Sequence, residues 1–208
     1  MSLRKWVAEK WVIDSYNNIY VTGQYQSSSQ VILQDANGTG QTASLVTLPA
    51  TSLFAAFIAK YSISGQVQWA TYIDGTGSDL GFSVTTDSYN NIYATGQYNS
   101  SSQVTLRDVS GTGQTASLVT LPSTSSNAVF IAKYNTSGQV QSATYIDGTG
   151  SDIGRSIISD SNNNLYVTGQ YQSSSQVTLQ DVSGNSQTPS LITLPAVSAD
   201  GLMLVKYI

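Results

Sequence analysis

Short runs of alternating apolar and polar residues recur along the chain, separated by turns rich in Gly, Asn, Asp and Ser. In the middle of the chain we place these runs at about 81–87, 91–98, 128–134 and 138–146. They are rich in β-branched and aromatic residues, which favour β-strands, and no segment keeps a helical period. Asn, Asp and Gly suit the tight turns between them. The pattern predicts an all-β chain.

The whole pattern repeats along the chain. The segment DSYNNIYVTGQYQSSSQVILQD, from Asp14, recurs in nearly the same form from Asp87 and from Asp160, 73 residues apart each time (87 − 14 and 160 − 87). The segment from Phe57 recurs from Phe130, and its third copy runs only to Ile208. Such a period is the signature of a repeat architecture. The chain therefore contains two full copies of one unit and part of a third.

Four strands joined by tight turns describe one blade of a β-propeller. The predicted fold is an all-β β-propeller built from 73-residue four-stranded blades, with three blades in a single repeat domain and the last blade incomplete. The blades are expected at about 8–79, 80–152 and 153–208. The stretch at about 100–126 is longer than a hairpin loop needs, and it predicts either an extra hairpin or a lengthening of the strands beside it.

Short motifs in a constant order carry a family resemblance. FIAKY at Phe57–Tyr61 is followed by GQVQWATYIDGTGSD at Gly65–Asp79 and by DSYNNIYATG at Asp87–Gly96. This order resembles the SBBP-type β-propeller repeat, over nearly all of the chain from Asp14 onward. The resemblance implies a propeller in a secreted or surface protein of bacteria or archaea, often with no assigned activity. It transfers no catalytic residue, and the long insert at 100–126 departs from the family's pattern.

The resemblance favours a non-enzymatic scaffold or interaction module, located outside the cell or on its surface. A multivalent, lectin-like carbohydrate-binding propeller is the first alternative, and a hydrolase that depends on Asp residues is a remote one. The 208 residues include no Cys and no His, which excludes thiol nucleophiles, imidazole bases and the usual zinc sites. A net charge of −4 gives no footprint for nucleic acid. No apolar run is long enough to insert into a membrane.

One repeated loop has the composition of a binding site. Tyr, Gln and Ser together offer flat apolar area and neutral hydrogen bonds, a mixture that suits sugars and adaptable protein contacts. If these side chains are exposed, they form equivalent sites around the ring; the alternative is that each Tyr packs against the insert. The candidate ligand-binding residues are Gln24, Tyr25, Gln97, Tyr98, Gln170 and Tyr171.

A second repeated loop carries carboxylates. Asp74 and Asp79 flank Gly-Thr-Gly-Ser, and Asp147 and Asp152 repeat this arrangement. Oxygen-rich turns with glycines suit calcium, the one ion for which the sequence suggests a site, although the spacing differs from that of an EF-hand. The alternative is that each Asp accepts hydrogen bonds from the backbone of its own turn. No other cofactor is expected.

The predicted ring is unfinished, because propellers usually have about 4–8 blades. The chain is then either a piece of a longer array or one half of a C2 dimer that closes a six-bladed ring. In the dimer hypothesis, residues 4–9 supply the missing outer strand of the partner's third blade, since Trp6 echoes Trp69. The alternative is a single long first strand. Trp69 itself is replaced by Ser142 in the next copy, so we expect its indole to pack on the outer strand and not to bind a ligand in every blade.

Overall fold

The computed structural model describes residues 5–37, 40–183 and 186–207, and these residues form 17 strands in antiparallel sheets. The predicted all-β class is therefore confirmed. The strands are β1 (Lys5–Ile13), β2 (Ile19–Gln26), β3 (Val31–Asn37), β4 (Gly40–Leu48), β5 (Ala55–Tyr61), β6 (Val67–Ile73), β7 (Leu80–Thr86), β8 (Ile92–Tyr98), β9 (Val104–Ser110), β10 (Gly113–Leu121), β11 (Ala128–Tyr134), β12 (Val140–Ile146), β13 (Ile153–Ser159), β14 (Leu165–Tyr171), β15 (Val177–Ser183), β16 (Ser186–Leu194) and β17 (Gly201–Tyr207).

Each copy of the repeat folds into one sheet, which we call units 1, 2 and 3. Unit 1 has the strand order β1-β2-β5-β6, and unit 2 has the equivalent order β7-β8-β11-β12. In unit 3 the described residues form the three strands β13-β14-β17. The four strands predicted for the middle copy match β7, β8, β11 and β12 to within a few residues.

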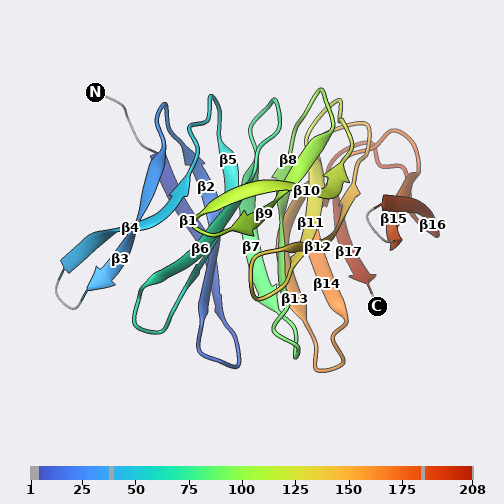
Figure 1. Cartoon of the computed structure of the whole chain (residues 1–208). Helices are drawn as coiled ribbons and strands as arrows, with labels where there is room; N and C mark the ends of the chain where they lie inside the picture. Colours follow the sequence, from blue (N-terminus) through green and yellow to red (C-terminus); the bar gives the residue numbers. More distant parts are fainter. Residues whose placement is uncertain (1–4, 38–39, 184–185, 208) are drawn as a thin grey trace.

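The insert between the second and third strands of each unit is a separate hairpin. The hairpins β3–β4, β9–β10 and β15–β16 each form their own two-stranded sheet, so the extra-hairpin alternative is correct and the lengthened-strand alternative is wrong. The second and third hairpins pack against the preceding unit, since β9 contacts β6 and β15 contacts β12. The first hairpin, β3–β4, contacts β6 of its own unit. Figure 1 shows β9 and β10 running across the neighbouring strands.

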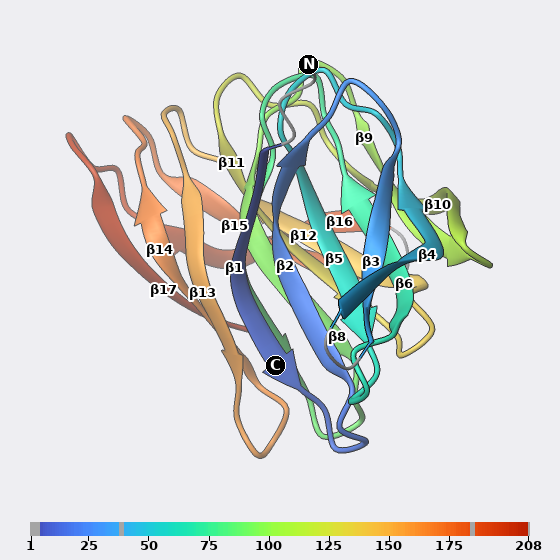
Figure 2. The ribbon, with the colours of Figure 1, turned by 90° about the vertical axis from the view of Figure 1, so that its left-hand side faces the viewer.

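The three sheets pack face against face, with β7 against β1 and β2, and β13 against β7 and β8 (Figure 2). The turns after the first strands link neighbouring units. Asn90 lies at a positive φ of 62°, and its side-chain oxygen accepts hydrogen bonds from the backbone and hydroxyl of Ser15 in unit 1, at 3.0 and 2.9 Å. Asn163 lies at 64° and accepts in the same way from Ser88 N–H. One Asn therefore closes its own turn and fastens it to the preceding unit.

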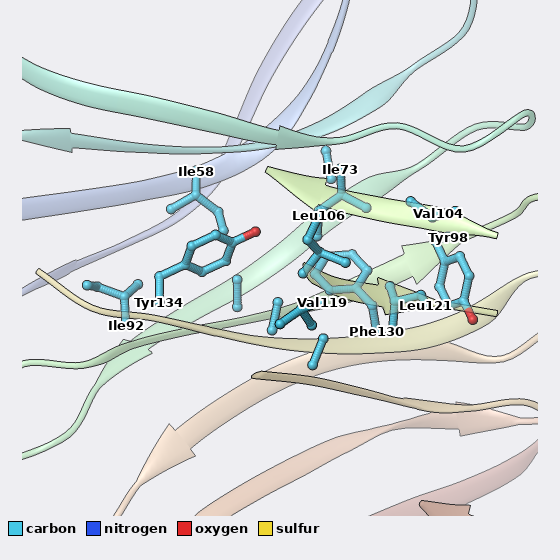
Figure 3. Packing of buried hydrophobic residues seen from close by; sticks show 14 of the residues in the cluster. Ile58, Ile73, Ile92, Tyr98, Val104, Leu106, Val119, Leu121, Phe130 and Tyr134 are labelled. Carbon is cyan, nitrogen blue, oxygen red and sulfur yellow. The ribbon is translucent and has the colours of Figure 1, made fainter. Parts of the chain in front are cut away.

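The hydrophobic core is divided among the contacts between units. We call the face of a unit that meets the following unit its back, and the face that meets the preceding unit its front. The largest cluster lies between the back of unit 1 and the front of unit 2 and includes the β9–β10 hairpin (Figure 3). Ile58 and Ile73 come from unit 1, Leu106 from the hairpin, and Phe130 and Tyr134 from β11. A second cluster joins units 2 and 3, and a third lies between unit 1 and its own hairpin. Burial of apolar area between neighbours therefore stabilises the array, as in other repeat proteins.

The N-terminal segment belongs to unit 1. β1 pairs with β2 from Lys5↔Gln26 to Ile13↔Ile19, with a bulge between Ala8 and Lys10. Residues 5–8 therefore begin one long first strand, which is the second of the two alternatives drawn from the sequence. Strand exchange by residues 4–9 would require this pairing to break, and residue 4 lies outside the described residues.

Candidate functional site

The candidate Gln-Tyr positions lie in the second strand of each unit and not in an open loop. The rings of Tyr25 and Tyr98 are completely buried, and Tyr171 is 3% exposed. Each ring joins a core cluster that includes its own hairpin, as the packing alternative predicted. Gln97 is also buried, whereas Gln24 and Gln170 are partly exposed. Ligand binding by these six residues stays a prediction, and the three rings lack the exposure that it requires.

The second Asp of each Asp-Gly-Thr-Gly-Ser-Asp loop is buried and stabilises that loop. Asp79 is completely buried and accepts hydrogen bonds from the N–H groups of Gly75 and Asn99, the latter at 2.9 Å. Asp152 is equally buried and accepts from the N–H groups of Gly148 and Gln172, the latter at 2.8 Å. The bonds from Gly75 and Gly148 agree with the alternative in which each Asp accepts from the backbone of its own turn, whereas Asn99 and Gln172 lie 20 residues further along the chain. Each Asp therefore links the loop between two units to the end of the second strand of the later unit.

Burial changes the acidity of these carboxyl groups. Burial raises the pKa of Asp79 to about 7, although its two backbone hydrogen bonds act in the opposite direction. Burial and the charge of Asp152 raise the pKa of Asp147 to about 6. Partial loss of contact with water also raises the pKa of Asp74, against the opposite effect of Arg107, although this side chain stays partly exposed at the surface. Shifts of this kind occur at catalytic sites, but here Asp79 and Asp152 each accept two backbone amides, one from their own loop and one from a residue 20 positions further on. The buried Oδ1 of Asp147 has no hydrogen-bond partner in the described part of the chain.

The arrangement of acidic groups bears on the calcium prediction. Asp74 is exposed while Asp79 is buried, and Asp147 is half-buried. Within the described ranges, no cluster of three or more Asp, Glu, His or Cys side chains could hold a metal ion. Calcium binding at Asp74, Asp79, Asp147 and Asp152 stays a prediction, and backbone amides already occupy oxygens of Asp79 and Asp152.

A different set of Asp residues closes the turn after each first strand. Asp14 accepts hydrogen bonds from the N–H groups of Tyr16 and Asn18 and from the hydroxyl of Tyr20 at 3.0 Å. Asp87 and Asp160 repeat this network 73 and 146 residues later. Burial would raise the pKa of Asp14, but its hydrogen bonds lower it further than burial raises it. Hydrogen bonds also lower the pKa of Asp160. In each unit this Asp holds the turn together.

Sequence reasoning missed the polar side chains that join each hairpin to the preceding unit. Gln114 donates to the carbonyls of Thr47 and Ala70, at 2.8 and 2.7 Å. Thr71 donates to the carbonyl of Arg107 at 2.8 Å. Gln187 and Thr144 repeat these bonds between units 2 and 3. The constant spacing in the sequence marked these residues, but their partners lie in another unit and no local pattern reveals them.

Trp69 lies in the outer strand β6, as predicted, but its indole points into the contact between units 1 and 2. It is 5% exposed and belongs to the largest core cluster. Its ring packs against Tyr20, with centroids 6.0 Å apart, and its Nε1 donates to the carbonyl of Thr136 at 3.1 Å. The indole therefore fastens the turn of unit 2 to unit 1.

Comparisons with known proteins place the chain near one repeat class. A search of the described ranges found no helix long and apolar enough to cross a membrane. No known family profile matches the chain. It is 28% identical over 176 residues to a protein of Acanthamoeba polyphaga mimivirus named "Uncharacterized WD repeat-containing protein L264". The match covers 78% of this chain and 12% of the viral protein, so the chain spans a small part of that relative.

Proposed function

We propose that the chain is a non-enzymatic repeat scaffold, three blades of a β-propeller that serves as an interaction module. WD repeats build propeller blades of four strands, and the similarity to a WD repeat-containing protein agrees with the four-stranded sheets of units 1 and 2. The SBBP type and a location outside the cell or on its surface remain predictions that depend on the resemblance.

One observation carries the scaffold proposal: two successive contacts between units use the same hydrogen bonds, 73 residues apart. Asn90 and Asn163, Gln114 and Gln187, and Thr71 and Thr144 are the repeated pairs. When successive units meet through the same contact, further units can be added to the array in the same way. The buried carboxylates are used in the same loops, as structural hydrogen-bond acceptors.

The two ends of the array carry the uncovered halves of this contact. At the front of unit 1, Trp11 is 63% exposed, whereas the equivalent Val84 and Ile157 are each 1% exposed. At the back of unit 3, Leu202 and Leu204 are 88% and 66% exposed. Their counterparts in unit 2, Val129 and Ile131, are buried. Exposed apolar faces of this kind favour association.

We propose that a second copy of the 208-residue chain covers these end faces. Because each end face is one half of a contact already made twice within the chain, the front of unit 1 in one copy is complementary to the back of unit 3 in the other. Two copies joined at both ends give a six-bladed ring with C2 symmetry. A further repeat of the same polypeptide would cover the same faces.

Light scattering of the purified chain tests the closed ring. The expected result is twice the mass of one chain, independent of concentration over a wide range. Leu204→Asp should give a monomer, because it places a charge in the centre of the end contact. Leu118→Asp is the matched control, since Leu118 is 82% exposed on the hairpin of the middle unit. A wild-type monomer, or a dimer that survives Leu204→Asp, would refute closure by a second copy.

The non-enzymatic part of the proposal has its own test. The Asp-based hydrolase alternative assigns no particular Asp, and Asp79 is the residue to test because burial raises its pKa to about 7. Screening the chain against hydrolase substrates, with Asp79→Asn as the comparison, should detect no activity that this substitution removes. Turnover that depends on Asp79 would overturn the scaffold proposal.

A further inference from the structure

The contact between units 2 and 3 contains a cavity of about 670 Å³. Ile131, Leu165 and Leu179 give it an apolar lining, and Tyr93, Lys133 and Ser142 add polar groups. Small-molecule sites are typically concave, mostly apolar and roughly 300–1,000 Å³ in volume. The cavity therefore has the size and the lining of a site for a small organic ligand.

The same place in the preceding contact is filled by a tryptophan side chain. Subtracting 73 from Ser142 gives Trp69, which is 5% exposed between units 1 and 2. The walls around both positions are nearly the same in sequence. Tyr93, Lys133, Thr144, Leu179 and Tyr207 correspond to the identical residues Tyr20, Lys60, Thr71, Leu106 and Tyr134. The chain thus contains one copy of this space with an indole inside it and one copy without.

The contact between units 1 and 2 shows how the surrounding residues pack against the Trp69 ring. The Trp69 ring lies 6.0 Å from the Tyr20 ring at an angle of 53°, an ordinary tilted aromatic contact. The Lys60 ammonium lies 5.6 Å from the centre of the Tyr20 ring, and in the other copy Lys133 lies 5.3 Å from that of Tyr93. The Tyr-Lys pair that flanks the indole is therefore already formed in the cavity beside Ser142.

The indole of Trp69 is also covered by a turn of the next unit. Thr136 accepts the indole hydrogen bond at 3.1 Å, and a Cβ added to Gly138 would lie 3.0 Å from the Trp69 ring. The counterpart of this turn would begin at position 208, beyond the described residues (208 − 73 = 135). In the first contact, between units 1 and 2, the segment 138–140 also bonds to Asp108 and Val109, whose counterparts Asp181 and Val182 line the cavity. The cavity volume therefore combines the space of an indole at position 142 with the space that such a segment fills in the first contact.

From this comparison we infer that the cavity between units 2 and 3 binds a small planar aromatic compound of the indole class. The ligand's ring would take the place that Trp69 occupies in the preceding contact, tilted against Tyr93 and surrounded by Ile131 and Leu179. Ser142 admits the ligand because its side chain is too small to fill the site. This inference does not depend on ring closure or on the scaffold proposal.

Calorimetric titration of the wild-type chain with free indole is the direct test. One site is expected, and Ser142→Trp should weaken binding by at least about tenfold, because the protein's own indole then fills the space. Ser102→Trp is the control for an added tryptophan, since Ser102 is exposed in a loop of unit 2. It should bind indole as the wild type does.

The reciprocal variant makes the test independent of how well Ser142→Trp folds. Trp69→Ser should open the equivalent space between units 1 and 2, so the variant should bind a second indole and regain thermal stability in its presence. Ser142→Leu provides another way to fill the cavity. The inference is overturned if wild-type protein does not bind indole up to its solubility limit, or if Ser142→Trp and Ser142→Leu both fold and bind it as the wild type does.

Discussion

The two contacts between units share their hydrogen bonds, but they differ at the central position 69/142 and in the number of described strands that the later unit brings to them. Both use the same Asn, Gln and Thr hydrogen bonds, and both bury equivalent strands and hairpins. The first is filled by Trp69, which also binds the turn at Thr136, whereas the second has Ser142 beside a cavity. The comparison teaches that the polar bonds set how the units are arranged, while the filling of the space between them varies independently.

The largest loss of stability should come from removing the Trp69 side chain, which fills the first contact. Trp69→Ser deletes a buried indole and its hydrogen bond, and such deletions cost about 3–5 kcal/mol of unfolding free energy. Ser142→Ala, at the equivalent position, should change it by less than about 0.5 kcal/mol. Urea unfolding followed by circular dichroism measures both. Equal costs at the two positions would mean that the contacts are not energetically different there.

A smaller loss is expected where one unit's backbone approaches another. A Cβ on Gly81 would lie 2.4 Å from Thr22 Oγ1, and one on Gly154 would lie 2.3 Å from Thr95 Oγ1. Alanine at either position should cost about 1–3 kcal/mol through overpacking. Unit 1, whose front has no neighbour, has Ala8 at this position.

The control for this steric prediction is Gly113→Ala, because a Cβ there meets nothing within 4 Å. Thermal unfolding of the three variants gives the comparison. If Gly81→Ala is as stable as Gly113→Ala, the units do not pack as closely as described.

The pH dependence of stability tests the loops between units. Burial raises the pKa of Asp79 to about 7, so between pH 4 and 7 the folded chain holds a proton that the unfolded chain releases. Stability should therefore fall as the pH rises from 5 to 8, by about 1–2 kcal/mol when solvent screening is allowed for. Melting temperatures across this range measure the effect.

Two features sharpen the pH prediction. Asp79→Asn should reduce the decline between pH 5 and 8, because one titrating group is removed, while Asp147, whose pKa is raised to about 6, still titrates in this range. Below about pH 4 the trend should reverse, since hydrogen bonds lower the pKa values of Asp14 and Asp160 and their protonation weakens the turns. Stability that rises from pH 5 to 8 in the wild type would contradict the burial of Asp79.

The smallest loss of stability is expected from the glutamine hydrogen bonds that the two contacts share. Gln114→Ala and Gln187→Ala each remove two hydrogen bonds to backbone carbonyls of the preceding unit, which should cost about 1 kcal/mol. The two losses should be equal within error, because the bonds are the same. Denaturant unfolding of both single variants checks this, and a negligible effect of Gln187→Ala alone would show that the second contact is looser.

Much of the fold could be predicted from the sequence, because strand periodicity and turn residues are local signals. The four strands of the middle copy and the hairpin at 100–126 were within reach of such signals. The candidate site was harder to predict from the sequence. Tyr25 and Tyr98 looked like exposed ligand-binding residues because their neighbours are polar, yet the hairpin buries both rings. The Asp-Gly pattern predicts the bond from Gly75 to Asp79, which is local, but not the bond from Asn99, which lies 20 residues away.

By itself, the sequence determined the β class, the 73-residue period and the division into repeated sheets, because alternation and turn chemistry act over a few residues. Only the tertiary structure decided that residues 5–8 belong to the first strand, that the second and third hairpins pack against the preceding unit, and that Trp69 and Ser142 occupy equivalent positions with different surroundings. The last two facts depend on which side chains meet across units, as Trp69 and Thr136 do at a separation of 67 residues. Such meetings are set by packing in three dimensions, and the order of residues along one strand carries no record of them.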